Sequence, residues 1–161
     1  MLEDLISGLS IIFQLEYIIF VFIGVFLGMI VGVLPGLSAT MGVALLTPIT
    51  FQLEATYAFG MLVGVYSGAF YGGGITACLL HTPGTPAAAA TVLDGFPMVQ
   101  KGKPERALGL VAYSSFFGGI FSTILLLFIA PILARFALNF GPPELFLLAI
   151  FGLTSIASII F

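Results

Sequence analysis

Two apolar stretches of this chain carry glycine at every fourth position, and this spacing restricts the folds open to them. The glycines are Gly24, Gly28, Gly32 and Gly36 in the first stretch, and Gly60, Gly64, Gly68 and Gly72 in the second. Each glycine costs a water-exposed helix about 1 kcal/mol relative to alanine. In a membrane the same spacing makes a flat ridge against which another helix packs closely. The pattern therefore predicts membrane helices that pack through glycine faces.

The composition indicates that lipid is the solvent of this chain. Of its 161 residues, 60% are hydrophobic and 7% are charged, and the mean hydropathy is +1.26. A soluble domain carries about 25% charged residues, so this chain cannot cover a water-facing surface. We expect an all-α, multi-pass integral membrane protein, with residues 1–161 forming one transmembrane domain. The single cysteine, Cys78, cannot form a disulfide within the chain.

The lengths of the apolar runs predict three spans and two shorter segments. Runs over 17–34, 55–80 and 107–136 are long enough to cross a bilayer, whereas 37–51 and 85–93 are short for a full span. We expect backbone breaks or re-entrant segments where the runs meet proline and glycine. These points are Pro35-Gly36, the triple glycine 72–74, and the sequence His81-Thr82-Pro83-Gly84.

Broken apolar helices mark substrate sites in secondary transporters, because freed backbone groups must face protein or a wet cavity. Helix N-termini at the two Pro-Gly breaks would attract an anion, and nearby hydroxyls would add ligands. A sodium ion could be held by carbonyls freed at the same breaks. The alternative interpretation is that the breaks are only kinks. The candidate substrate-binding residues are Pro35, Gly36, Ser38, Thr40, Gly73, Gly74, Thr76, His81, Thr82, Pro83, Gly84 and Thr85.

Two polar segments set the expected orientation in the membrane. Residues 1–14 have an apolar repeat at helical spacing, which predicts an amphipathic helix at the interface. Residues 94–106 read as a polar loop that holds three of the four basic residues, and the positive-inside rule makes this loop cytoplasmic. Asp94-Gly95 predicts a turn. The alternative interpretation gives Asp94 a gating or coupling role.

A series of motifs resembles one transporter family in order and spacing. The residues are Gly32–Leu37, Leu46–Phe51, Tyr71–Thr76, Thr82–Thr85, Asp94–Met98, Lys101-Gly102, Ala107–Gly109 and Phe140–Phe146. They resemble the large membrane subunit of tripartite tricarboxylate transporters over nearly the whole chain. Two residues depart from the family pattern, because Gly74 stands where serine is expected and His81 where asparagine is expected. Both departures bear on the preference for substrate or coupling ion.

The resemblance implies a permease in a bacterial inner membrane that takes up a tricarboxylate or a related carboxylate. It also implies a small membrane subunit and a periplasmic solute-binding protein as partners. The driving force would be a gradient of Na⁺ or H⁺, with no cofactor and no catalytic or metal site. The family's subunits are much longer, and the run from Glu144 is still apolar at Phe161. We therefore expect this chain to be the N-terminal portion of a longer transporter.

Two further functions compete with transport by a permease. A membrane-embedded hydrolase could use His81 and Asp94, but the sequence has neither an HExxH metal motif nor a GxSxG nucleophile turn. A truncated structural or assembly subunit without transport of its own is the second alternative.

Overall fold

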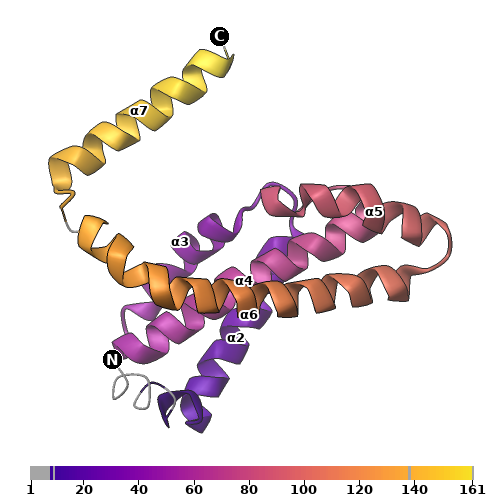
Figure 1. Cartoon of the computed structure of the whole chain (residues 1–161), viewed down its shortest axis with the longest axis horizontal. Coiled ribbons are helices and arrows are strands. Elements are labelled where there is room, and N and C mark those ends of the chain that lie inside the picture. The colour runs from indigo at the N-terminus through magenta and orange to yellow at the C-terminus, as the bar shows by residue number, and fades with distance from the viewer. Residues whose placement is uncertain (1–7, 9, 138, 161) are drawn as a thin grey trace. The chain divides into compact units, whose positions relative to one another are not determined.

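The computed structural model describes residues 8, 10–137 and 139–160, and these form helices joined by short turns (Figure 1). In chain order the elements are α2 (Leu15–Val33), α3 (Ala39–Thr50), α4 (Ala55–Leu80), the short 3₁₀ helix η1 (Pro86–Ala88), α5 (Ala89–Gln100), α6 (Pro104–Ala137) and α7 (Pro142–Ile160). The described residues contain no strand, so the all-α prediction is confirmed. Within the same residues, α2, α4 and α6 are long and apolar enough to cross a membrane.

The chain divides into two compact units. The first extends to Ser115 and contains α2 to α5 with the beginning of α6, and the second starts at Phe116 and contains the rest of α6 with α7. Pro131 lies inside α6 and does not end it. Every candidate substrate-binding residue lies in the first unit.

The core of the first unit is the interface between α2 and α4. A Cβ atom on Gly24, Gly28 or Gly32 would collide with the backbone carbonyl of Met61, Val65 or Ala69, respectively. From the other side, a Cβ on Gly64 would lie 2.6 Å from the carbonyl oxygen of Val21, and Gly68 and Gly72 meet the backbone of Val25 and Met29 in the same way. The prediction that the glycine ridges are packing faces is therefore confirmed for these six glycines, whereas nothing lies within 4 Å of a Cβ on Gly36.

The register of this interface shows that α2 and α4 run in the same direction. Gly24 faces Met61 and Gly32 faces Ala69, so both helices advance together. At the beginning of both helices the Tyr57 hydroxyl donates to Glu16 Oε2 over 3.1 Å. Because α2 and α4 are parallel, the chain must run back from the end of α2 to the level at which α4 begins. Helix α3 makes this connection with 12 residues, or about 18 Å of helix. The short run 37–51 is thus a helix that packs on α4.

The triple glycine at 72–74 does not break its helix, contrary to the sequence-based expectation. Helix α4 is continuous from Ala55 to Leu80 and ends at His81, which has the left-handed φ of 58°. The three glycines instead accept other chain segments at close range. Gly73 contacts Thr85, with 2.7 Å between the position of a Cβ and Thr85 Oγ1, and Gly74 contacts Val111 at 2.8 Å. At these three positions, glycine permits close packing and does not end the helix.

The expected polar loop over 94–106 is also mostly helical. Asp94 and Gly95 lie inside α5, and only Lys101–Lys103 connect α5 to α6. Asp-Gly does not form a turn here because Gly95 packs directly on Cys78 of α4, where a side chain would collide with Sγ. The short segment predicted over 85–93 accordingly extends to Gln100. The amphipathic helix predicted over 1–14 falls mostly on residues 1–7 and 9, outside the described residues.

We predict that a methyl group on the α2 ridge destabilises the protein. Gly28→Ala places a Cβ against the Val65 backbone, which cannot move aside as a flexible side chain can. The free energy of unfolding should fall by roughly 1–3 kcal/mol. Thermal unfolding of the purified protein in detergent measures this change. Gly118→Ala is the matched control, because nothing lies within 4 Å of a Cβ there. An unchanged unfolding temperature for Gly28→Ala would show that the interface is looser than described.

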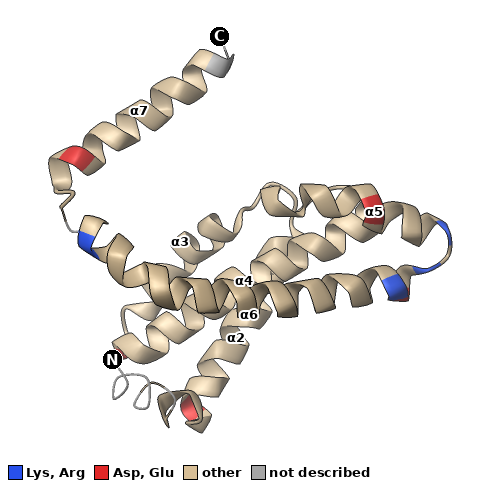
Figure 2. Ribbon diagram, in the orientation of Figure 1, with Lys and Arg blue, Asp and Glu red and all other residues tan. Residues whose placement is uncertain are grey.

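The basic turn between α5 and α6 is predicted to be cytoplasmic. Lys101, Lys103 and Arg106 gather at this turn (Figure 2), and positively charged residues stay on the cytoplasmic side. A cysteine at Gln100, in a Cys78→Ala background, should therefore resist a membrane-impermeant thiol reagent in intact cells and react after permeabilisation. Ready labelling in intact cells would reverse the topology.

Candidate functional site

The two Pro-Gly breaks meet at one cavity of about 280 Å³. We call it the break cavity; it is lined by Gly36, Leu37, Ser38, Pro83, Gly84, Thr85 and Pro86. The first break follows α2 directly. The second break follows α4, but the chain doubles back after His81 until Gly84 lies beside Gly73, where the Gly84 N–H donates to the Gly73 carbonyl over 3.4 Å. Two segments about 50 residues apart in sequence thus face the same space.

Three glycines make this meeting possible. A Cβ on Gly84 would collide with the carbonyl oxygen of Gly32, and it would lie 2.9 Å from Gly73 Cα and 2.8 Å from Thr76 Oγ1. The return loop can therefore enter the angle between α2 and α4 only because Gly84 and Gly73 lack side chains where the loop passes α4 and the Gly32 carbonyl. The glycine ridges end at this crossing, so the same packing that joins the helices also positions the breaks.

The N-terminus of α3 opens onto the break cavity. Ser38 is its N-cap residue, and the Ser38 Oγ accepts a hydrogen bond from the Met41 N–H over 3.2 Å. The hydroxyls of Ser38 and Thr40 are 2.7 Å apart and hydrogen-bonded. The first turn of a helix has free N–H groups and the positive end of the helix dipole, so this end of α3 favours an anion.

The second break contributes differently from the sequence-based expectation of a second helix N-terminus. It leads first into η1, which has three residues and begins at Pro86, a residue without an N–H. What the break does supply is Thr85. This residue is 2% exposed, and its Oγ1 is buried with no hydrogen-bond partner among the described residues. A buried hydroxyl without a partner costs roughly 1–3 kcal/mol, which a ligand would offset.

The other candidate residues lie around this cavity but not in its lining. Thr76 is buried, and its hydroxyl donates to the Gly73 carbonyl over 3.1 Å. Thr82 is exposed, and its hydroxyl donates to the Leu80 carbonyl over 3.2 Å. The His81 ring contacts the Phe96 ring of α5 in a tilted arrangement, with ring centroids 4.4 Å apart, and thereby joins the end of α4 to α5. These three side chains support the backbone of the second break.

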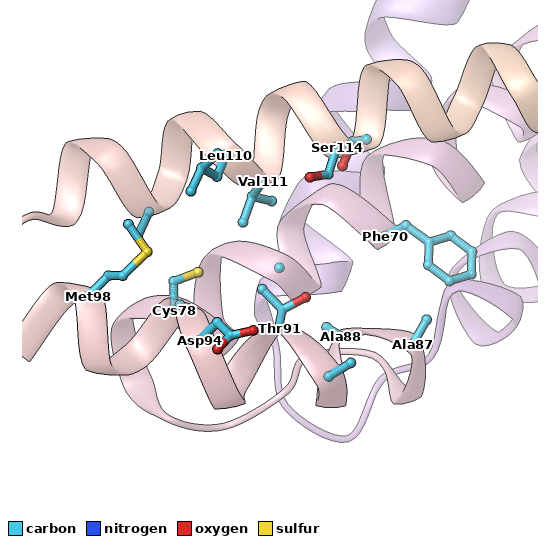
Figure 3. Close-up of a pocket in the computed structure, with 15 residues that line it drawn as sticks. Phe70, Cys78, Ala87, Ala88, Thr91, Asp94, Met98, Leu110, Val111 and Ser114 are labelled. Atoms are coloured by element: carbon cyan, nitrogen blue, oxygen red, sulfur yellow. The ribbon is translucent and has the colours of Figure 1, made fainter.

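A second cavity, which the sequence analysis missed, lies on the other side of η1. It has a volume of about 480 Å³ between α4, α5 and the first turns of α6 (Figure 3). We call it the Asp94 cavity after the one charged residue in its lining. The lining also includes Gly74, Cys78, Thr91, Val111 and Ser114. The Asp94-Gly95 pair favours a turn locally, so the sequence pattern does not reveal that Thr91 and Asp94 share one face of α5.

These features define a class of protein: an α-helical membrane protein whose short, broken segments meet at a polar cavity. The family comparison narrows the class further. Residues 18–160 match the family model described as the tripartite tricarboxylate transporter TctA family. The chain belongs to this family. It is a family of transporters and not of enzymes, so the hydrolase alternative with His81 and Asp94 is set aside.

A curated relative agrees with this assignment. The chain is 46% identical over 154 residues to an uncharacterized 52.8 kDa protein in the TAR-I ttuC' 3'region of Agrobacterium vitis. The aligned part is 93% of this chain and 31% of the relative, so the chain spans about a third of that protein's length. No solved structure gave a significant match.

Removal of the unpartnered hydroxyl is predicted to stabilise the protein when no substrate is present. Thr85→Val keeps the shape of the side chain and removes a buried polar atom without a partner. The free energy of unfolding should rise by about 1 kcal/mol. Thr76→Val is the matched comparison, because it removes a hydroxyl that is hydrogen-bonded, and it should destabilise. Thermal unfolding in detergent distinguishes the two. A loss of stability in Thr85→Val equal to that in Thr76→Val would mean that Thr85 Oγ1 has a partner.

Proposed function

We propose that this chain forms the substrate-binding part of a permease that takes up a tricarboxylate or related carboxylate, driven by a gradient of Na⁺ or H⁺. The permease would work in a bacterial inner membrane with a small membrane subunit and a periplasmic solute-binding protein. Membership of the TctA family supports this role. The single structural observation that carries it is the junction of both Pro-Gly breaks at one cavity.

The chemistry of the break cavity suits an anion. Its lining contains no acidic side chain, and the positive end of α3 opens onto it. A carboxylate in a setting of low dielectric needs several donors aimed at it, because an unsatisfied charge is costly there. The free N–H groups of the first turn of α3 and the hydroxyl of Thr85 would supply such donors. In other secondary transporters, the N-termini of discontinuous helices point the same kind of groups at the carboxylate of the substrate.

Substitutions at the cap of α3 test this assignment without removing the cap itself. Asparagine and aspartate both cap helices as well as serine does. Ser38→Asn should therefore bind a carboxylate nearly as well as the parent. Ser38→Asp adds a negative charge to the cavity and should weaken the apparent affinity by about tenfold or more, since like charges at close range repel each other.

The measurement is uptake of a labelled carboxylate panel by the complete transporter with its partner subunits, as a function of carboxylate concentration. Protein level and unfolding temperature should be similar for the two variants. Equal apparent affinities for Ser38→Asp, Ser38→Asn and the parent would place the carboxylate elsewhere and leave the breaks as kinks. An absence of uptake from the parent complex with every carboxylate would favour the alternative of a structural or assembly subunit.

A further inference from the structure

The Asp94 cavity places a carboxylate where no basic group offsets its charge. Asp94 is the one charged residue in the lining, and among the described residues it has no ion-pair partner. The basic residues of the chain closest to it in sequence, Lys101, Lys103 and Arg106, belong to the turn beyond α5 and do not line the cavity. Asp94 is exposed, so its carboxylate is accessible to an ion that enters the cavity.

The polar neighbours of Asp94 are neutral oxygen donors. Thr91 precedes it by one helical turn on α5, and Ser114 and Ser115 line the cavity from α6. Figure 3 shows Asp94 and Thr91 on one side of the space and Ser114 with Val111 on the other. Hydroxyl and carboxylate oxygens are the ligands that hard cations prefer, and the volume leaves room for water to complete the coordination shell.

The composition of the lining restricts the charge of the cation. A divalent ion such as Ca²⁺ or Mg²⁺ is normally held by more than one carboxylate, and transition metals prefer His and Cys nitrogen and sulfur ligands. The described residues contain no group of three or more His, Cys, Asp or Glu that could hold a metal ion. One carboxylate with several neutral oxygens fits a monovalent cation.

We propose that the Asp94 cavity binds a sodium ion, with the Asp94 carboxylate as its charged ligand and the hydroxyls of Thr91 and Ser114 as neutral ones. This site is separate from the carbonyls of the two breaks, which were the first candidates for a cation. A carboxylate compensates the ion's charge, and the break cavity has none. Sodium binding in the Asp94 cavity does not depend on the proposed function. The role of this sodium as the coupling ion rests on the proposed function.

The position of the cavity explains how sodium would influence the carboxylate. Pro86 lines the break cavity, and the next two residues, Ala87 and Ala88, line the Asp94 cavity. On α4, Gly73 contacts Thr85, while Gly74 lines the Asp94 cavity. The helix η1 and this part of α4 therefore form a shared wall. An ion that pulls Asp94 and α6 together would fix η1, and thereby the position of Thr85. By linkage, the carboxylate would raise the affinity for sodium by the same factor.

The test measures sodium binding by the complete transporter in detergent without any carboxylate. The unfolding temperature is followed as NaCl replaces choline chloride or KCl at constant ionic strength, because an ion that binds the native state raises it. The parent should show a saturable rise that is specific for sodium. Asp94→Asn should raise the half-saturating sodium concentration about tenfold or more, since the charged ligand is lost. Glu105→Gln, which removes a carboxylate outside both linings, is the matched control and should respond like the parent.

Further variants distinguish loss of the sodium site from loss of folding. If Asp94→Asn does not fold, Thr91→Val and Ser114→Ala retain the carboxylate and should each raise the half-saturating concentration about threefold or more. Ser38→Asp, which alters only the break cavity, should keep the full sodium response even if carboxylate binding fails. Equal effects of sodium and potassium on the parent would overturn the proposal. A parental sodium response in both Asp94→Asn and Thr91→Val would overturn it as well.

Discussion

The close approach of backbones at glycine is the constraint on which the first unit of this protein depends. The hydrophobic effect does not drive helices together in lipid, so association relies on van der Waals contact between close surfaces. Gly28 and Gly32 bring α2 against the carbonyls of α4, and Gly64 and Gly68 do the same from the other side. The parallel register that results forces the chain to return through α3, and it places the end of α2 beside Gly73.

The proposed function depends on the arrangement of the chain where the glycine ridges end. Gly84 enters between Gly32 and Gly73, and no residue with a side chain could take its place. This insertion carries Thr85 into a buried position and sets it across a cavity from the N-terminus of α3. The polar groups freed by the two breaks thus face one space, which is the arrangement a transporter needs to hold a charged substrate in the membrane.

Much of this arrangement could be predicted from the sequence. The spacing of the glycines predicted the packing faces, the length of the apolar runs predicted α2, α4 and α6, and the two Pro-Gly pairs predicted the breaks. Three predictions failed. The second Pro-Gly break does not begin an α-helix with free N–H groups, because it leads into the three-residue η1, which starts at Pro86. The other two failures share a reason. The triple glycine at 72–74 and Asp94-Gly95 have local preferences for breaks and turns, but tertiary contacts with Thr85, Val111 and Cys78 keep both segments helical. Such contacts join distant segments, so no local pattern reveals them. The pairing of Asp94 with Ser114 across helices was hidden for the same reason.

If both breaks belong to one carboxylate site, residues on the two breaks should be close enough to cross-link, and a bound carboxylate should interfere. Leu37→Cys and Pro86→Cys place one thiol on each break in a Cys78→Ala background, within the complete transporter. We expect a short bifunctional thiol reagent to join the two cysteines and a transported carboxylate to slow the reaction. No cross-link, or a cross-link formed at the same rate with and without every carboxylate tested, would show that the two breaks do not share a carboxylate site.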